Sequence, residues 1–500
     1  MVRETRVDVA VVGNGVLGLA VAVETARRAP GLRIAVIGPP GRAGAATAAA
    51  GAMLNCFGEV TRYTGWHPAA QAKFALARQA LNRWPRWLEQ LADDAGPPTG
   101  ETALRSHVPG TFVVLGAGAG AIAADNFTAL CRAVEEHGEP HDVIDPVDVP
   151  GLDPAPQARP LRAVHLHREG CVDARAVLAA LEAAACRHRV RMVPDTASEV
   201  LVTADTVRGV RLADGSTLDA GAVVLAAGSR SSELTADVLP PGAVPPLLHG
   251  AGSALLTRRT RPGGAHQAIR TPNRAAGCGL HLLPLPGTER QYLGATNFIT
   301  CQRPDGPVVG AAEILIRSAR QEIDQALAGS QLTAWMWGAR PITLDGFPLI
   351  GSCPVAGLHF ATGTYRDGFH CAPVIARHLA ARLLGPGPAD ADWAWFTPYR
   401  APIETMTVEQ SLTETATHAA ETAREHGLRL PFFLDDEPVA TYVRDRAHRL
   451  FDRLGHPVAL PPEILLLAFT LAARGNDHPA RWLADHLHAA RTHHAPAPDA

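Results

Sequence analysis

The sequence contains an arginine whose setting suits it to bind an anion, Arg340 in the segment Gly338–Pro373. Pro341 follows it directly, and the residue before a proline is biased towards extended backbone. We therefore expect Arg340 to project from the end of a strand. A guanidinium in a largely dry pocket can hold a carboxylate through two parallel hydrogen bonds. The alternative is a structural arginine that pairs with an acidic neighbour.

A strand, a turn and a helix follow in the same segment. The apolar run Leu358–Ala361 predicts the strand, Tyr365–Gly368 the turn, and Ala372–Leu384 the helix. The start of a helix carries free N–H groups and partial positive charge, which favour a bound anion. Arg366 in the turn is a second candidate cation, or else it pins the turn through Asp367 or a backbone carbonyl.

His281 is the third candidate, because it lies in the apolar stretch Leu280–Pro284. A histidine can orient a substrate or accept a proton near neutral pH. Equally, it can be an inward polar residue that its neighbours satisfy. His165 and His167 would share one face of a strand, where packing or surface roles are common. The eight cysteines include no CxxC pair, so we expect neither a metal site nor a disulfide framework.

The elements that would position these side chains begin with a β-α-β unit near the N-terminus. Buried strands are predicted over Val7–Val12 and Leu32–Ile37, with a helix over Leu19–Arg28 between them. The glycines after the first strand have the spacing that lets a chain turn tightly, approach a pyrophosphate and pack helix on strand. This dinucleotide-binding turn consists of Gly13, Asn14, Gly15, Val16, Leu17 and Gly18.

The second strand of this unit lacks the acidic residue that usually binds the adenosine ribose. It ends instead in Gly38-Pro39-Pro40-Gly41. Backbone groups or another side chain must then contact the ribose, or the affinity for the dinucleotide is reduced.

Later segments are predicted to add strands to this dinucleotide-binding core, with insertions between them. A strand over Val223–Leu225 ends in Ala226-Ala227-Gly228, small residues that let a cofactor approach closely. We predict an α/β fold in which a discontinuous α+β substrate domain interrupts a dinucleotide-binding domain, followed by a helical region. The predicted ranges are 1–95, 160–238 and 335–388 for the dinucleotide-binding domain, 96–159 and 239–334 for the substrate domain, 400–493 for the helical region, and 494–500 for a disordered tail.

The composition and charge of the chain limit the classes of molecule that we expect it to bind. The chain has 500 residues, of which 47% are hydrophobic and 19% charged, enough for a large core and two or three domains. The formal net charge of −3 comes without a basic block, so we expect no nucleic-acid partner. No apolar run reaches the roughly 20 residues of a membrane span. We therefore expect small-molecule partners, and the scattered cysteines without a disulfide framework favour a reducing, cytoplasmic setting.

From about Asp8 to Leu384 the chain resembles the FAD-dependent amine-oxidising family that includes glycine oxidase, D-amino-acid oxidase and monomeric sarcosine oxidase, and it resembles glycine oxidase most. The segment from Arg340 through the turn is the most specific match. The other matching segments are Thr47–Leu54, which resembles a small-residue helix start under the flavin, Arg168–Arg175, which resembles an EGxVDPR motif, Val223–Ser229, and the strands Leu280–Pro284 and Gly294–Thr296.

The resemblance implies FAD as the cofactor, held by a Rossmann-like domain. It also implies that Arg340 binds the substrate carboxylate and that His281 replaces a substrate-facing tyrosine of glycine oxidase. Arg366 belongs to the loop that wraps the flavin pyrimidine ring. Besides the glycine turn, the implied cofactor-binding residues are Ala46, Thr47, Ala50, Gly51, Met53, Ala227, Gly228, Thr364, Tyr365, Arg366, Asp367, Gly368, Phe369 and His370.

The implied reaction is oxidation of the C–N bond of a small amino acid or N-substituted amino acid to an imine, with O2 as acceptor and H2O2 as product. Sarcosine oxidase uses a lysine near the flavin to assist oxygen, and the single lysine here is Lys73, so a dehydrogenase stays open. A monooxygenase of another carboxylate-bearing substrate and a non-catalytic interaction protein stay open as well. The C-terminal helices could form a homo-oligomer contact, cover the active site or dock a carrier-bound substrate.

Overall fold

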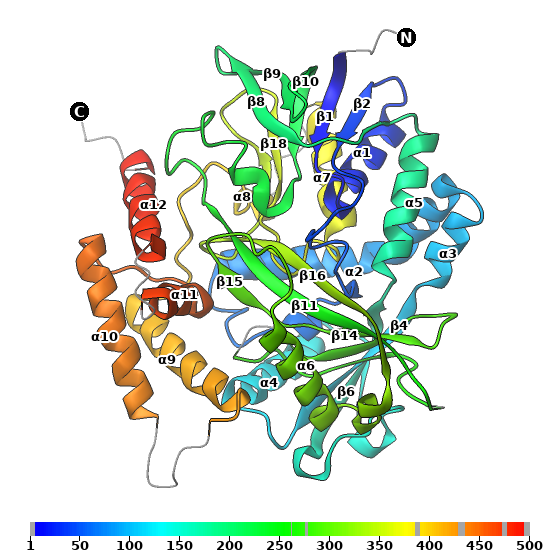
Figure 1. The fold of residues 1–500 in the computed structure, drawn as a ribbon, viewed down its shortest axis with the longest axis vertical. Coiled ribbons are helices and arrows are strands. Elements are labelled where there is room, and N and C mark those ends of the chain that lie inside the picture. Colours follow the sequence, from blue (N-terminus) through cyan, green and yellow to red (C-terminus); the bar gives the residue numbers. More distant parts are fainter. Residues whose placement is uncertain are drawn as a thin grey trace.

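The computed structural model describes residues 6–261, 263–275, 279–385, 391–428, 436–472 and 478–494. Within these ranges the chain forms two β-sheets, which Figure 1 shows one above the other, with a group of C-terminal helices at one side. Apart from its first residue, the predicted disordered tail, 494–500, lies outside the described residues.

The first sheet is built around the predicted β-α-β unit. Its strand β1 (Arg6–Val12) runs parallel to both of its neighbours, and its apolar side chains are buried as in other parallel sheets. The described strands follow the order β17 (Leu349–Ser352), β18 (Leu358–Thr362), β10 (Thr217–Leu225), β1, β2 (Ile34–Ile37) and β7 (Arg191–Val193), with β9 (Thr206–Leu212) beside β10 and β8 (Ala197–Thr203) beside β9.

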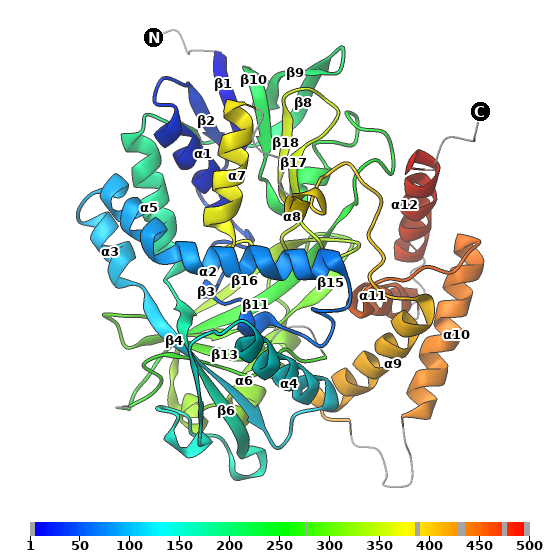
Figure 2. The same ribbon diagram turned by 180° about the vertical axis from the view of Figure 1, so that it is seen from behind.

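Helices cover one face of the first sheet, and two glycines let them pack closely. Gly13 has φ +120°, and a Cβ there would lie 2.2 Å from the carbonyl oxygen of Ala226 at the end of β10. A Cβ on Gly18 would lie 1.8 Å from the carbonyl oxygen of Gly13. The helices of this layer, seen from behind in Figure 2, are α1 (Val16–Arg28), α2 (Pro68–Ala95), α3 (Thr99–Arg105), α5 (Ala174–Arg187) and α7 (Ala372–Leu384).

The second sheet is mostly antiparallel and is covered on both faces. Helices α4 (Ala121–Glu136) and α6 (Val309–Glu322) pack on opposite faces, because alternate residues of β4 join the core under each helix. The described strands follow the order β15 (Phe298–Thr300), β11 (Leu247–Arg258), β14 (Arg290–Gly294), β13 (His281–Pro284), β12 (Ala268–Arg270), β4 (Val108–Gly116), β6 (Pro160–Cys171) and β3 (Met53–Leu54), with β16 (Gln331–Thr343) beside β11 and β5 (His141–Ile144) beside β6.

The sheets divide the chain differently from the predicted boundaries. The ranges 160–238 and 335–388 assign β6 and most of β16 to the dinucleotide-binding domain, but both strands lie in the second sheet. β6 pairs antiparallel with β4 over most of its length, and β16 pairs in the same way with β11. These long ladders extend each strand past the point where its sequence would suggest a change of domain.

The segment Thr47–Leu54 is not the helix start that the resemblance implied. It runs through a turn into β3, which pairs with β6. Just before it, Ala45 forms a bridge with Ala339 of β16, and a Cβ on Gly338 would lie 2.8 Å from the carbonyl oxygen of Ala45. The small residues in this region therefore serve the close approach of two extended segments.

The predicted helical region is confirmed, and it packs against the second sheet. Leu248 and Ile342 of that sheet share a core with Leu412, Leu450 and Leu465 of the C-terminal helices. Among the described helices, none combines the length and apolarity that crossing a bilayer requires. The helices are α8 (Ala391–Ala394), α9 (Val408–Glu425), α10 (Glu437–Leu454), α11 (Pro462–Ala472) and α12 (His478–His494).

Candidate active site

A cavity of about 540 Å³ runs between the two sheets. The first sheet contributes the ends of β1 and β10, and the second sheet contributes side chains of β13, β14 and β16. The predicted site residues that line it are Gly13, Asn14, Gly15, Val16, Leu17, Ala46, Thr47, Ala50, Gly51, Met53, Ala227, Gly228, His281, Arg340, Thr364, Tyr365, Arg366, Gly368 and Phe369.

Three predicted cofactor-binding residues lie outside this lining, and each has a contact that explains its place. Gly18 packs against the backbone of Gly13. Asp367 forms an ion pair with Lys73 at 3.0 Å, and Nε2 of His370 donates to the carbonyl oxygen of Ala77 at 2.8 Å. Asp367 and His370 thus fasten the flavin loop, Thr364–His370, to α2.

The end of the cavity near β1 has the form of a phosphate site. Gly15 is the N-cap of α1, with no side chain to fill the space in front of the helix. The first free N–H groups of α1 and its dipole there favour an anion. The hydroxyl of Thr47 accepts a hydrogen bond from the N–H of Val16 at 3.3 Å, which joins the small-residue segment to this helix start.

The structure also shows why no acid ends the second strand. A Cβ on Gly38 would lie 2.4 Å from Cγ of Asn14, whose Nδ2 donates to the carbonyl oxygen of Pro39 at 3.0 Å. The Asn14 side chain therefore occupies the corner that an acidic residue would need. Arg42 lines the same corner, and its Nε donates to the carbonyl oxygen of Asn14 at 2.9 Å.

His281 faces the cavity as a neutral imidazole. Burial, reinforced by the charge of Arg270, lowers the pKa of His281 to about 4. Its Nδ1 lies 3.1 Å from the carbonyl oxygen of Gly279, and because a carbonyl only accepts, Nδ1 carries the proton. Nε2 thus keeps its lone pair on the side of Gly51 and Gly294, where a Cβ on Gly294 would come within 2.5 Å of it.

Arg340 lies within β16 rather than at its end, opposite Gly250 of β11. Its NH1 donates to the carbonyl oxygen of Thr296 at 3.1 Å and to Oδ1 of Asn297 at 3.3 Å. A Cβ on Gly252 would lie 2.2 Å from that NH1, so the glycine makes room for the guanidinium. No carboxylate in the described part of the chain forms an ion pair with Arg340, and its positive charge faces the cavity.

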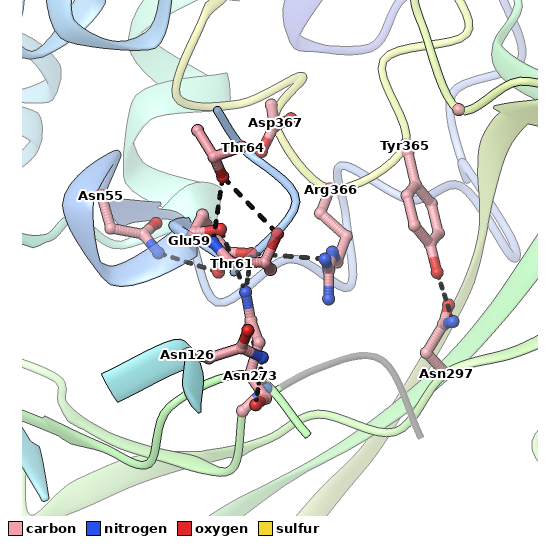
Figure 3. Close-up of polar contacts among 12 residues, drawn as sticks. Asn55, Glu59, Thr61, Thr64, Asn126, Asn273, Asn297, Tyr365, Arg366 and Asp367 are labelled. Atoms are coloured by element: carbon pink, nitrogen blue, oxygen red, sulfur yellow. Dashed lines mark hydrogen bonds and ion pairs between the residues drawn. The ribbon is translucent and has the colours of Figure 1, made fainter. Parts of the chain in front are cut away.

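Arg366 lies beside an acidic residue that the sequence did not single out. Its NH2 is 3.6 Å from Oε2 of Glu59, and its guanidinium stacks on the ring of Tyr365 at 5.1 Å. Glu59 also accepts a hydrogen bond from Arg270 at 2.8 Å. A second comes from Asn55 at 3.0 Å (Figure 3). Burial alone would raise the pKa of Glu59, but Arg270 and Arg366 outweigh it and hold that pKa far below its usual range.

Sequence reasoning missed Glu59 and the residues that hold it. Asn273 donates to Oε2 of Glu59 at 3.2 Å and is itself held by Asn126, whose Nδ2 donates to its carbonyl oxygen at 2.9 Å (Figure 3). Arg270 is 1% exposed. A charged residue that follows the apolar pair Ala268–Ile269 was the one available signal, since a buried arginine needs a partner.

His165 and His167 share one face of β6 as predicted, and Asp142 of β5 joins them. The three ligand-type atoms lie within 4.8 Å of one another, away from the cavity. Asp142 is already bonded to Nε2 of His167 at 2.7 Å, and Phe112 stacks on His165 at 4.3 Å. Pairing accounts for Asp142 and His167 and stacking for the ring of His165, while Nε2 of His165 has no hydrogen-bond partner among the described residues.

Comparisons with known proteins agree with this geometry. The family model DAO, described as FAD dependent oxidoreductase, matches residues 8–382. A bifunctional protein ThiO/ThiG from Synechocystis is 26% identical over 384 residues, which is 76% of this chain, and the match spans about half, 52%, of that longer protein. A glycine oxidase from Geobacillus kaustophilus is 28% identical over 384 residues, covering 75% of this chain and 92% of the relative. The crystal structure of glycine oxidase from Geobacillus kaustophilus superposes with a TM-score of 0.65 at 24% identity, over 79% of this chain and 99% of that one.

Proposed function

Because this chain belongs to the DAO family of FAD-dependent oxidoreductases, we propose that it oxidises the C–N bond of a small amino acid or N-substituted amino acid to an imine, with O2 as acceptor and H2O2 as product. The similarity to a glycine oxidase supports an amino acid as the substrate. The imine would then hydrolyse in water.

The residues at the β1 end of the cavity fit the family's cofactor. Gly13 and Gly15 have no side chain in front of α1, where a pyrophosphate would bind. On the opposite side of the cavity, Ala227 and Gly228 are small enough to leave room for the cofactor. Thr47 would complete this end through its hydroxyl. When bound, FAD supplies the acceptor for the hydride that leaves the carbon next to nitrogen.

Arg340 is the observation that carries the proposal. It lines the same cavity as the glycine turn, and no acidic side chain among the described residues neutralises it. Its hydrogen bonds to Thr296 and Asn297 both start from NH1, so the guanidinium can still bind a carboxylate. A carboxylate held there fixes the position of the rest of a small amino acid, which is the main task of the protein in such a reaction.

His281 is suited to the amine end of the substrate. Its ring lines the cavity, with Nε2 next to Gly51, and its low pKa keeps the ring neutral at neutral pH. A neutral imidazole can accept a hydrogen bond from the substrate nitrogen and so orient it, but with a pKa of about 4 it is too weak a base to take the proton of an ammonium group. The nitrogen must be neutral before the C–H bond is broken. Arg366 keeps the flavin loop in place through Glu59 and so acts on the reaction less directly.

Steady-state assays separate this function from an NAD(P)H-dependent or acceptor-dependent one. An amino-acid oxidase forms one H2O2 for each amino acid consumed in air, whereas a dehydrogenase needs an added electron acceptor. A monooxygenase consumes NAD(P)H instead. Peroxide formation with glycine, sarcosine or a D-amino acid, without NAD(P)H, is the expected result, and NAD(P)H consumption coupled to oxygen uptake would contradict it.

A further inference from the structure

The C-terminal helices reach the wall of the cavity through one hydrogen bond. Glu463 lies in the first turn of α11, and its Oε2 accepts a hydrogen bond from the hydroxyl of Tyr365 at 2.8 Å. Tyr365 is a cavity-lining residue of the flavin loop, with φ +49° and a buried ring. A residue outside the range matched by the family model therefore contacts a residue of the candidate active site.

This contact continues to the arginine that faces the cavity. Asn297 donates from Nδ2 to the hydroxyl oxygen of Tyr365, and Figure 3 shows the two side chains directed towards each other. Oδ1 of the same amide accepts from NH1 of Arg340 at 3.3 Å. Every donor points the same way, from Arg340 through Asn297 and Tyr365 to the carboxylate of Glu463. A chain of this kind is polarised by the charges at its two ends, which strengthens each bond in it.

The surrounding contacts hold α11 firmly enough for this role. Tyr365 shares a core with Leu460, Ile464 and Leu465, so its ring packs against the same helix that its hydroxyl contacts. The hydroxyl of Ser411 in α9 donates to the carbonyl oxygen of Leu460, which joins α9 to the chain just before α11.

Helix α9 contacts the segments that follow Glu59 and Asn273 in the chain. Glu414 accepts hydrogen bonds from Arg62 and from Tyr63, which follow Glu59 in the chain. Nδ1 of His418 donates to the carbonyl oxygen of Ala275 at 3.0 Å, close to Asn273. The C-terminal helices therefore contact Tyr365 of the candidate active site through α11 and segments next to that site through α9.

We propose that Glu463 is a positioning residue that sets the orientation of Arg340 through Tyr365 and Asn297, and that the C-terminal helices thereby contribute to the affinity for carboxylate substrates. The proposal rests on the proposed function, in which Arg340 binds the substrate carboxylate. With NH1 fixed by Asn297 and Thr296, the remainder of the guanidinium is presented to the cavity in one orientation. Without the carboxylate of Glu463, the hydroxyl of Tyr365 loses its acceptor, and this hydroxyl is in turn the acceptor that orders Asn297.

The test uses the full-length, FAD-loaded protein and two probes, acetate and its uncharged counterpart acetamide. Binding is followed by the change in flavin absorbance for wild type, Glu463→Gln, Tyr365→Phe, the double variant, and Arg340→Gln. Glu409→Gln in the exposed first turn of α9 is the matched control. We expect Glu463→Gln to weaken acetate binding about 3- to 10-fold, with acetamide binding, FAD content and Tm unchanged. In the Tyr365→Phe background Glu463→Gln should have no further effect, and Glu409→Gln should match wild type.

Each other outcome has a distinct meaning. If Arg340→Gln binds acetate as wild type does, the proposed function is wrong at its carboxylate site. If Arg340→Gln loses acetate but Glu463→Gln keeps it, only the positioning role of Glu463 is wrong. The same holds if the effects of Glu463→Gln and Tyr365→Phe add, or if Glu463→Gln weakens acetamide and lowers Tm to the same degree, because Glu463 then acts on the fold alone.

Discussion

Arg366 pairs with Glu59, 3.6 Å away, and not with Asp367, its neighbour in the sequence. Asp367 pairs instead with Lys73 of α2 at 3.0 Å. The flavin loop is thus fastened by two ion pairs to two different elements, one before α2 and one within it. Since Lys73 does not line the cavity, the single lysine of the chain serves this loop.

Glu59→Gln should destabilise the protein, because Arg270 is buried and Glu59 is its ion-pair partner. Removing one charge of a buried pair leaves the other uncompensated, at a cost of about 3 kcal/mol. The free energy of unfolding in urea measures this. Glu101→Gln breaks the exposed pair with Arg105 and should cost less than about 1 kcal/mol. Equal losses in the two variants would contradict the structural role of Glu59.

Gly38→Asp should reduce FAD binding, although an acidic residue at this position binds the ribose in other dinucleotide-binding folds. The reason is steric, because Asn14 occupies the corner into which the new side chain would point. The double variant Asn14→Gly/Gly38→Asp removes the Asn14 side chain and should restore FAD binding. The FAD content of purified protein and the dissociation constant from flavin fluorescence measure both effects. Tighter FAD binding by the single variant would contradict this account.

The affinity for acetate should not change through protonation of His281 between pH 6 and 8. Protonation of His281 would add a positive charge to the cavity and strengthen anion binding as the pH falls. With its pKa lowered to about 4, that gain begins only below about pH 5, whereas an unperturbed histidine would produce it near pH 6.5. Wild type and His281→Gln should therefore give parallel affinity profiles from pH 6 to 8. If the acetate affinity of wild type changed with a midpoint near pH 6.5, and this change were absent in His281→Gln, the His281 ring would not be neutral at neutral pH.

Local patterns predicted much of the fold. Buried parallel strands, the glycine turn and the long helices each leave a periodic or compositional signal, and the predicted helix Ala372–Leu384 agrees with α7 to the residue. The strand memberships of β6 and β16 could not be predicted in this way. They depend on ladders with β4 and β11, and pairing partners leave no trace in the periodicity of one strand.

In the candidate site, too, some features could be predicted from the sequence and others could not. Arg340, His281 and Arg366 were predicted, because a cation before a proline, a histidine in an apolar run and a cation in a tight turn are visible in the sequence. The partners of these residues were not. Glu59 lies far before the flavin loop in the sequence and Glu463 far after it, and only the tertiary fold brings them to Arg366 and Tyr365.

The central claim is that Arg340 holds the carboxylate of an amino acid that reduces the bound FAD. Loss of the yellow flavin absorbance without oxygen tests it, with glycine, sarcosine and D-alanine each compared with the amine that lacks the carboxylate: methylamine, dimethylamine and ethylamine. At least one amino acid should bleach the wild-type protein while its amine does not. Arg340→Gln should raise the amino-acid concentration for half-maximal bleaching at least about tenfold, as loss of a two-point charged contact implies. Arg258→Gln, on the exposed end of β11, should match wild type. Equal bleaching by acid and amine, an unchanged Arg340→Gln, or FAD that none of the three amino acids reduces would contradict the account.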